Sequence, residues 1–81
     1  DLTPQMADRI DEATGEAETV LSSMVRKGDL LLVRPGGRIP VDGTVEQGCS
    51  YVNQSALTGE EVPLYAEPGT AVLAGSANGE A

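Results

Sequence analysis

The chain of 81 residues contains no histidine, tryptophan or phenylalanine, and two tyrosines are its only aromatic residues. Without histidine it lacks the commonest catalytic base and the commonest ligand of transition metals. Cys49 is the only cysteine, which excludes a disulfide within these residues and a zinc site built from several thiolates. We interpret Cys49 as a small packing residue.

Long apolar runs and positive charge are also missing. No run approaches the roughly 18 residues needed to span a bilayer, and no signal-peptide pattern opens the chain, so we expect it to be soluble as given. The formal net charge of −8 disfavours binding to nucleic acid or to an anionic membrane surface. We interpret the acidic residues as a solvated surface.

The ten glycines and five prolines break the chain into short segments that leave little room for ordinary helices. With few aromatics, the core must come from Val, Leu, Ile, Met and Ala, and Met6 and Met24 are candidates for the core or for filling gaps in it. We predict a single small all-β domain, a compact sandwich or distorted jelly roll. The expected strands lie within residues 1–14, where a helix is the alternative, and at residues 19–21, 30–33, 39–41, 44–46, 51–52 and 71–74.

Two details of this scheme are specific. The apolar run at residues 30–33 fits a strand that is buried on both faces, and Asp42-Gly43 fits a tight hairpin turn. At residues 76–81 we expect a ragged or truncated edge.

The most informative segment covers residues 55–63, Ser-Ala-Leu-Thr-Gly-Glu-Glu-Val-Pro. Gly59 allows a sharp turn there, because it can adopt backbone angles that are closed to other residues. We predict that Leu57, Val62 and Leu64 are buried as the apolar feet of the loop. A loop of this kind would present Glu60 so that its carboxylate can orient a water molecule or accept its proton. The chain supplies no nucleophile for Glu60 to serve, so the reacting group must come from elsewhere.

This segment and two others together resemble the actuator domain of P-type ATPases. The others are Gly28-Asp29 and the run Pro35-Gly36-Gly37-Arg38-Ile39-Pro40-Val41-Asp42-Gly43, in the family's order and at close to its spacing. The resemblance implies that residues 1–81 are one actuator domain excised from a larger membrane ATPase. It also implies a small distorted jelly roll, a sandwich similar to a double-stranded β-helix.

The resemblance assigns the chemistry to three residues. Glu60 would position and polarise the water that attacks an aspartyl phosphate on another domain, Gly59 would allow close approach, and Thr58 would add a short polar side chain. No cofactor is implied in this domain, whereas the parent enzyme uses ATP and Mg²⁺. The implied partners are the phosphorylation and nucleotide-binding domains and the transmembrane helices of the same chain. The segment would then be a cytoplasmic part of an integral membrane protein, inactive when isolated.

The run from Ile39 to Gly43 is most similar to the heavy-metal-transporting branch of the family. Copper is the first candidate for the transported ion, and zinc or cadmium the second. The chain departs from the family pattern at Asn53-Gln54, where two acidic residues are usual, and the departure bears on how the loop is positioned.

Other interpretations stay open at this point. The chain could be a stand-alone β-sandwich module that binds a ligand such as carbohydrate, or a carrier domain that uses Lys27. A second Thr-Gly-Glu triplet, at residues 14–16, fits an exposed hairpin tip, and Glu61 receives no role. Arg34 and Arg38 would pair either with a neighbouring domain or with acidic groups on the domain's own surface.

Overall fold

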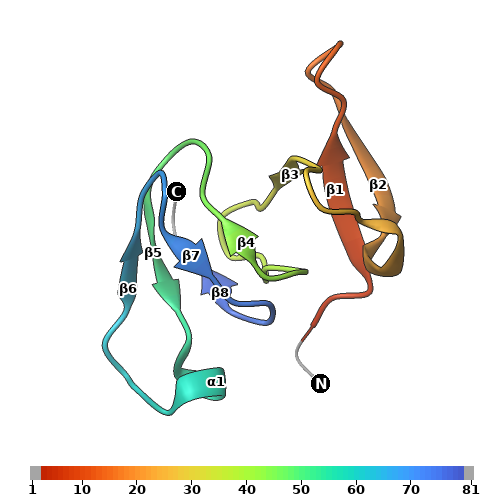
Figure 1. The fold of residues 1–81 in the computed structure, drawn as a ribbon. Coiled ribbons are helices and arrows are strands. Elements are labelled where there is room, and N and C mark those ends of the chain that lie inside the picture. Colours follow the sequence, from red (N-terminus) through yellow and green to blue (C-terminus); the bar gives the residue numbers. More distant parts are fainter. Residues whose placement is uncertain (1–2, 80–81) are drawn as a thin grey trace.

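The computed structural model describes residues 3–79, and short β-strands dominate it (Figure 1). Within these residues one turn of α-helix (α1) and one 3₁₀ turn (η1) are the only helical elements. The predicted all-β fold is therefore confirmed. In chain order the elements are β1 (Met6–Ile10), β2 (Ala17–Leu21), η1 (Ser22–Met24), β3 (Leu31–Leu32), β4 (Gly43–Thr44), β5 (Ser50–Asn53), α1 (Ser55–Thr58), β6 (Leu64–Ala66), β7 (Ala71–Val72) and β8 (Ala77–Asn78).

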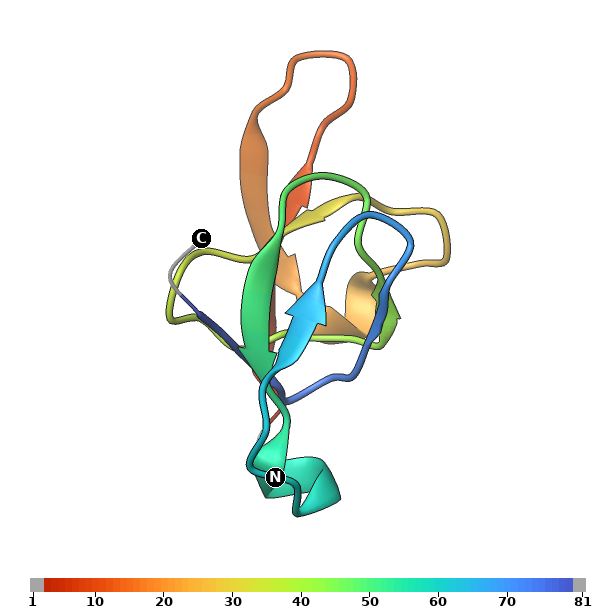
Figure 2. The same cartoon turned by 90° about the vertical axis from the view of Figure 1, so that its left-hand side faces the viewer.

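The strands form three small antiparallel sheets. Their orders are β2-β1-β3, β4-β7 and β6-β5-β8. The first sheet occupies one side of the molecule and the other two occupy the opposite side (Figure 1). A quarter turn of the molecule shows that the tip of the β1–β2 hairpin and α1 lie at opposite ends (Figure 2).

The first sheet settles the ambiguous N-terminal segment in favour of a strand. β1 pairs with β2 from Met6↔Leu21 to Ile10↔Ala17, and with β3 at Asp8 and Arg9. Because β3 pairs only with β1, it is an edge strand, and the prediction that it is buried on both faces is wrong. Leu32 is 38% exposed.

The core lies between the other two sheets. Its buried cluster consists of Ile39, Val52, Ala66 and Val72, with Val33 and Val45 packed against it. These side chains are small or β-branched, as strand packing favours. Met6 and Met24 are about half exposed, so the prediction that places them in the core is wrong. Both belong to the side of the molecule that carries the first sheet, away from this cluster.

The predicted hairpin turn at Asp42-Gly43 is also wrong. Gly43 has no positive φ and begins β4, where it pairs with Val72. The Asp42 carboxylate instead accepts a hydrogen bond from the backbone N–H of Ala74 at 2.7 Å, and so ties the entry of β4 to the exit of β7.

Residues 76–79 do not form the expected ragged edge. β8 pairs with β5, and Arg38 forms an additional bridge with Ala77. Gly79 lies so close to β5 that a Cβ atom there would stand 2.6 Å from the carbonyl oxygen of Tyr51. β8 therefore makes β5 the central strand of its sheet, while Glu80 and Ala81 lie outside the described residues.

Candidate functional site

The Thr-Gly-Glu loop leaves the end of β5 and folds first into the single turn α1. The turn ends at Gly59, whose φ of 80° and ψ of −5° lie in the left-handed region that favours glycine. The N–H of Gly59 donates to the carbonyl oxygen of Ser55 at 2.9 Å. Gly59 thus performs the sharp turn that the sequence predicts, immediately before Glu60.

Hydrogen bonds within the loop fix its shape. The Thr58 hydroxyl donates to the carbonyl oxygen of Gln54 and accepts from the N–H of Glu60, both at 3.2 Å. At the start of the turn, Asn53 Oδ1 accepts from the N–H of Ser55 at 2.8 Å. These hydrogen bonds connect Thr58 and Glu60 to each other and to the preceding turn, and Asn53 lies where that turn joins β5.

The loop is not held by buried apolar feet. Leu57 is 44% exposed and Val62 is 80% exposed, so that prediction is wrong for both, and only Leu64 is partly buried. The reason is that the loop projects beyond the end of its sheet, where no other layer covers it (Figures 1 and 2). An open hollow of about 280 Å³ remains beside it, lined by Gln54, Thr58, Glu60, Val62, Pro63 and Leu64.

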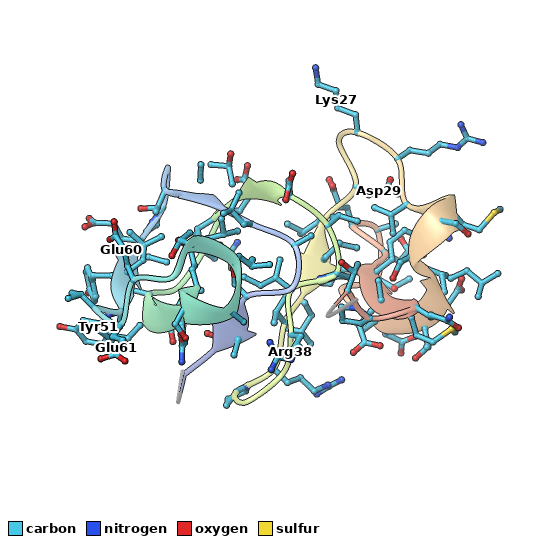
Figure 3. All side chains as sticks on the ribbon, turned by 90° about the horizontal axis from the view of Figure 1, so that it is seen from below. Lys27, Asp29, Arg38, Tyr51, Glu60 and Glu61 are labelled. Atoms are coloured by element: carbon cyan, nitrogen blue, oxygen red, sulfur yellow. The ribbon has the colours of Figure 1, made fainter. Side chains whose placement is uncertain are left out.

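The two adjacent glutamates of the loop are both exposed. Figure 3, which views the molecule from the end that carries α1, shows Glu60 and Glu61 directed away from the body of the protein. Of these two glutamates, only Glu60 lines the hollow described above. Its carboxylate makes no hydrogen bond or ion pair to any other described residue, so it is free to meet an external group.

The second triplet has nearly the same local geometry. Gly15 has a φ of 77°, and the N–H of Glu16 donates to the Thr14 hydroxyl at 3.2 Å, as in the first triplet. Asp11 there accepts from the N–H of Ala13 at 2.9 Å, in the same way that Asn53 serves Ser55. These residues form the exposed β1–β2 hairpin tip, as predicted, at the end of the molecule opposite α1 (Figure 2).

The arginines make contacts on the domain itself. Arg34 Nε lies 3.6 Å from Asp8 Oδ2, which is the surface ion pair that the sequence offered as one alternative. Arg38 instead donates to the carbonyl oxygen of Gly75 at 2.7 Å, and Figure 3 shows it at the lower edge of that view. Both arginines line a second hollow of about 170 Å³ between the first sheet and residues 37–40.

Cys49 is exposed, so its interpretation as a packing residue is wrong. It precedes β5 and contacts Tyr65, whose ring centroid lies 5.1 Å from that of Tyr51 on the neighbouring strand. The hydrogen bond to Cys49 and the negative charge of its thiolate raise the pKa of Tyr65, since both favour the protonated phenol.

Two kinds of functional feature are absent from residues 3–79. No group of three or more His, Cys, Asp or Glu side chains is placed to hold a metal ion. None of the helices in this part of the chain has the length and apolar character required to cross a membrane.

Comparison with known proteins identifies the domain. A sequence profile of the P-type ATPase actuator domain matches residues 1–81. The chain belongs to this family. Its membership removes the reasons for considering a stand-alone binding module or a carrier domain.

Several relatives resemble the chain closely. It is 44% identical to a copper-transporting ATPase of Schizosaccharomyces pombe over 96% of its own length and 8% of the relative's. It is 46% identical to a copper-exporting P-type ATPase of Legionella pneumophila over 95% of its length and 10% of the relative's. A probable cobalt/nickel-exporting P-type ATPase of Mycolicibacterium smegmatis is 43% identical over 98% of this chain and 12% of that protein.

Solved structures agree on the fold. The crystal structure of a zinc-transporting PIB-type ATPase in its E2.Pi state matches with a TM-score of 0.88 and 37% identity, over 98% of this chain and 13% of that one. A second crystal structure of a zinc-transporting PIB-type ATPase, in another state, also matches with a TM-score of 0.88, at 35% identity. The chain thus spans about a tenth of the length of the proteins it matches.

The sequence singled out the loop but missed what holds it. Neither the Asn53 cap nor the two bonds of the Thr58 hydroxyl was expected. The order Asn-x-Ser before an apolar turn was the available signal, because asparagine commonly bonds the backbone N–H two residues ahead.

Proposed function

We propose that this chain is the cytoplasmic actuator domain of a heavy-metal-transporting P-type ATPase, and that Glu60 promotes hydrolysis of the aspartyl-phosphate intermediate. The observation that carries the proposal is the geometry of residues 58–60. A carboxylate without a partner among the described residues is presented on a left-handed glycine turn, at the end of the molecule, in a domain of the P-type ATPase family.

Each residue of the triplet has a distinct part in this proposal. Glu60 orients the attacking water in line with the phosphorus atom and accepts its proton. Gly59 presents no side chain to the phosphate, and its turn directs Glu60 outward. Thr58 fixes the N–H of Glu60 through its hydroxyl. The negative charge of the phosphate favours proton uptake by a neighbouring carboxylate, which assists the transfer.

The rest of the machinery lies in other parts of the proposed parent. Its phosphorylation domain carries the aspartate, its nucleotide-binding domain takes ATP with Mg²⁺, and its transmembrane helices carry the metal. The isolated domain is then inactive. Copper is our first choice for the cargo, because relatives named as copper transporters match over almost the whole chain, and zinc or cadmium is the second.

The test is the decay of the phosphoenzyme in the full-length ATPase. Membranes are labelled with radioactive ATP in the presence of each candidate metal and then chased with unlabelled ATP. We expect Glu60→Gln to form the phosphoenzyme normally and to lose it at least about a hundredfold more slowly, because removal of a general base typically costs two to four orders of magnitude.

Two matched controls come from the same chain. Glu61→Gln changes the adjacent exposed carboxylate, and Glu16→Gln changes the carboxylate of the second triplet. Both should decay like the wild type. If Glu60→Gln also decays at the wild-type rate, the catalytic assignment is refuted, and the loop is only a surface turn.

A further inference from the structure

The loop that carries Glu60 has almost no packing to hold it in place. α1 contains no buried residue, and Leu57 and Val62 are exposed on either side of the glutamate. A single helical turn of four residues is unstable by itself, because the first turn orders several residues for very few hydrogen bonds. The shape of the loop must therefore depend on side-chain hydrogen bonds at its two ends.

One of these ends is Asn53, which belongs to the rigid part of the fold. It is the last residue of β5, the central strand of its sheet, and pairs with Ala77 of β8. The preceding residue, Val52, is 3% exposed and sits in the core cluster. The side-chain oxygen Oδ1 of Asn53 accepts a hydrogen bond of 2.8 Å from the N–H of Ser55, the first residue of α1. No side chain caps the turn from the N-cap position itself, Gln54.

Short hydrogen bonds continue from this point to the glutamate. Ser55 accepts from the N–H of Gly59 at 2.9 Å, and Thr58 accepts from the N–H of Glu60 at 3.2 Å. The position of Ser55 thus influences where the left-handed turn begins and which way Glu60 points. Asn53 is the residue that ties Ser55 to the sheet.

We propose that Asn53 is a positioning residue for the hydrolysis of the phosphoenzyme, and that its amide oxygen keeps α1 folded so that Glu60 is presented in one orientation. This inference rests on the proposed function of Glu60. Asn53 itself touches no reacting atom. The hydrogen bond that Asn53 accepts raises the fraction of domains in which the loop is already ordered before it reaches the phosphate. The conformational entropy of the loop is then not lost during the reaction step.

The test uses the full-length ATPase and the same phosphoenzyme decay. Asn53→Ala removes the acceptor, and we expect decay about five- to tenfold slower, because the loss of one hydrogen bond typically lowers the population of the folded turn by about this factor. Asn53→Asp keeps an acceptor oxygen at the same reach and should restore the rate to within about twofold, and Asn53→Ser, whose hydroxyl makes the same bond more weakly, should restore it in part. Formation of the phosphoenzyme should not change in any of them.

Asp11→Ala is the matched control. It removes the equivalent bond to Ala13 at the second triplet, on the opposite end of the domain. We expect normal decay. Hydrogen–deuterium exchange provides a second readout: the peptide covering residues 54–60 should exchange faster in Asn53→Ala, and at the wild-type rate in Asn53→Asp.

The outcomes separate the two proposals. If Glu60→Gln slows decay but Asn53→Ala does not, the positioning role is refuted and the function of Glu60 stands. If alanine, serine and aspartate at position 53 all slow decay equally, the acceptor oxygen is not what matters, and the inference also fails. If Glu60→Gln itself has no effect, the proposed function fails first.

Discussion

Gly59 offers the sharpest separation between stability and function in this domain. Its φ of +80° is a left-handed conformation, which costs an L-residue about 1–2 kcal/mol. A Cβ added there would meet no atom within 4 Å, so strain is the only penalty of Gly59→Ala. Alanine also restricts the unfolded chain, which offsets about 0.4–1 kcal/mol. The net loss of stability is therefore about 1 kcal/mol, or a fall in Tm of about 4–8 °C for a domain of this size.

Gly15 provides the matched measurement. Its φ is +77° and its surroundings are equally open, so Gly15→Ala should lower the urea-unfolding free energy by the same amount within about 0.5 kcal/mol. The phosphoenzyme decay should differ. Gly59→Ala should slow it at least about tenfold, because relief of the strain turns Glu60 away from its productive orientation, and small misplacements are costly in catalysis. If the two variants lose equal stability and both decay normally, the left-handed turn is not needed for the chemistry.

Two further predictions concern packing and titration. Val52→Ala should lower the free energy of unfolding by about 2 kcal/mol, because Val52 is 3% exposed. Val62→Ala should change it by less than about 0.5 kcal/mol, because Val62 is 80% exposed. Equal losses of stability in urea unfolding would contradict the finding that the loop lacks buried apolar feet. The pKa of Tyr65 is raised, first by its hydrogen bond to Cys49, so the folded state holds the phenol proton more tightly than the unfolded chain does, and this contribution is lost as the pH rises through the pKa of the folded state. In a Tyr51→Phe background, Cys49→Ala should lower the tyrosinate titration midpoint seen by ultraviolet absorbance, and an unchanged midpoint would rule out the contact.

The strands were predictable because local chemistry determines most of them. Glycines and prolines delimit the segments, and β-branched or apolar residues fill them, so the all-β class and most strand positions follow from composition and spacing, although β6 and β8 were not predicted. What failed were statements about burial and partners. The run at residues 30–33 is as apolar as a central strand, yet β3 lies at an edge. In a domain this small there is too little interior to bury every apolar residue, and only tertiary pairing decides which ones remain outside.

Turn chemistry misled the prediction at Asp42-Gly43 for a related reason. Asp-Gly suits a tight turn, but the Asp42 side chain found a partner 32 residues away, at the N–H of Ala74. A carboxylate can satisfy a backbone donor in its own turn or in a distant segment, and the sequence between them does not say which. The ragged edge expected at residues 76–81 is not seen at residues 76–79 for a similar reason, because β8 pairs with β5 and Gly79 packs closely against that strand.

The two Thr-Gly-Glu triplets show where the functional signal resides. They share the glycine conformation, the hydroxyl bond to the glutamate N–H and an aspartate or asparagine that caps the backbone just before them. They differ in their flanks, because a proline, Pro63, follows only the first triplet and the helical turn α1 precedes only that one. They differ in what carries them: the first extends from β5, between two strands and next to the core, and the second is the tip of a hairpin whose strand β2 is an edge. A carboxylate that must meet a phosphate on another domain needs a rigid strand to hold its loop more than it needs a particular type of turn. Loosening β5 from β8 should therefore slow phosphoenzyme decay even with residues 53–60 unchanged.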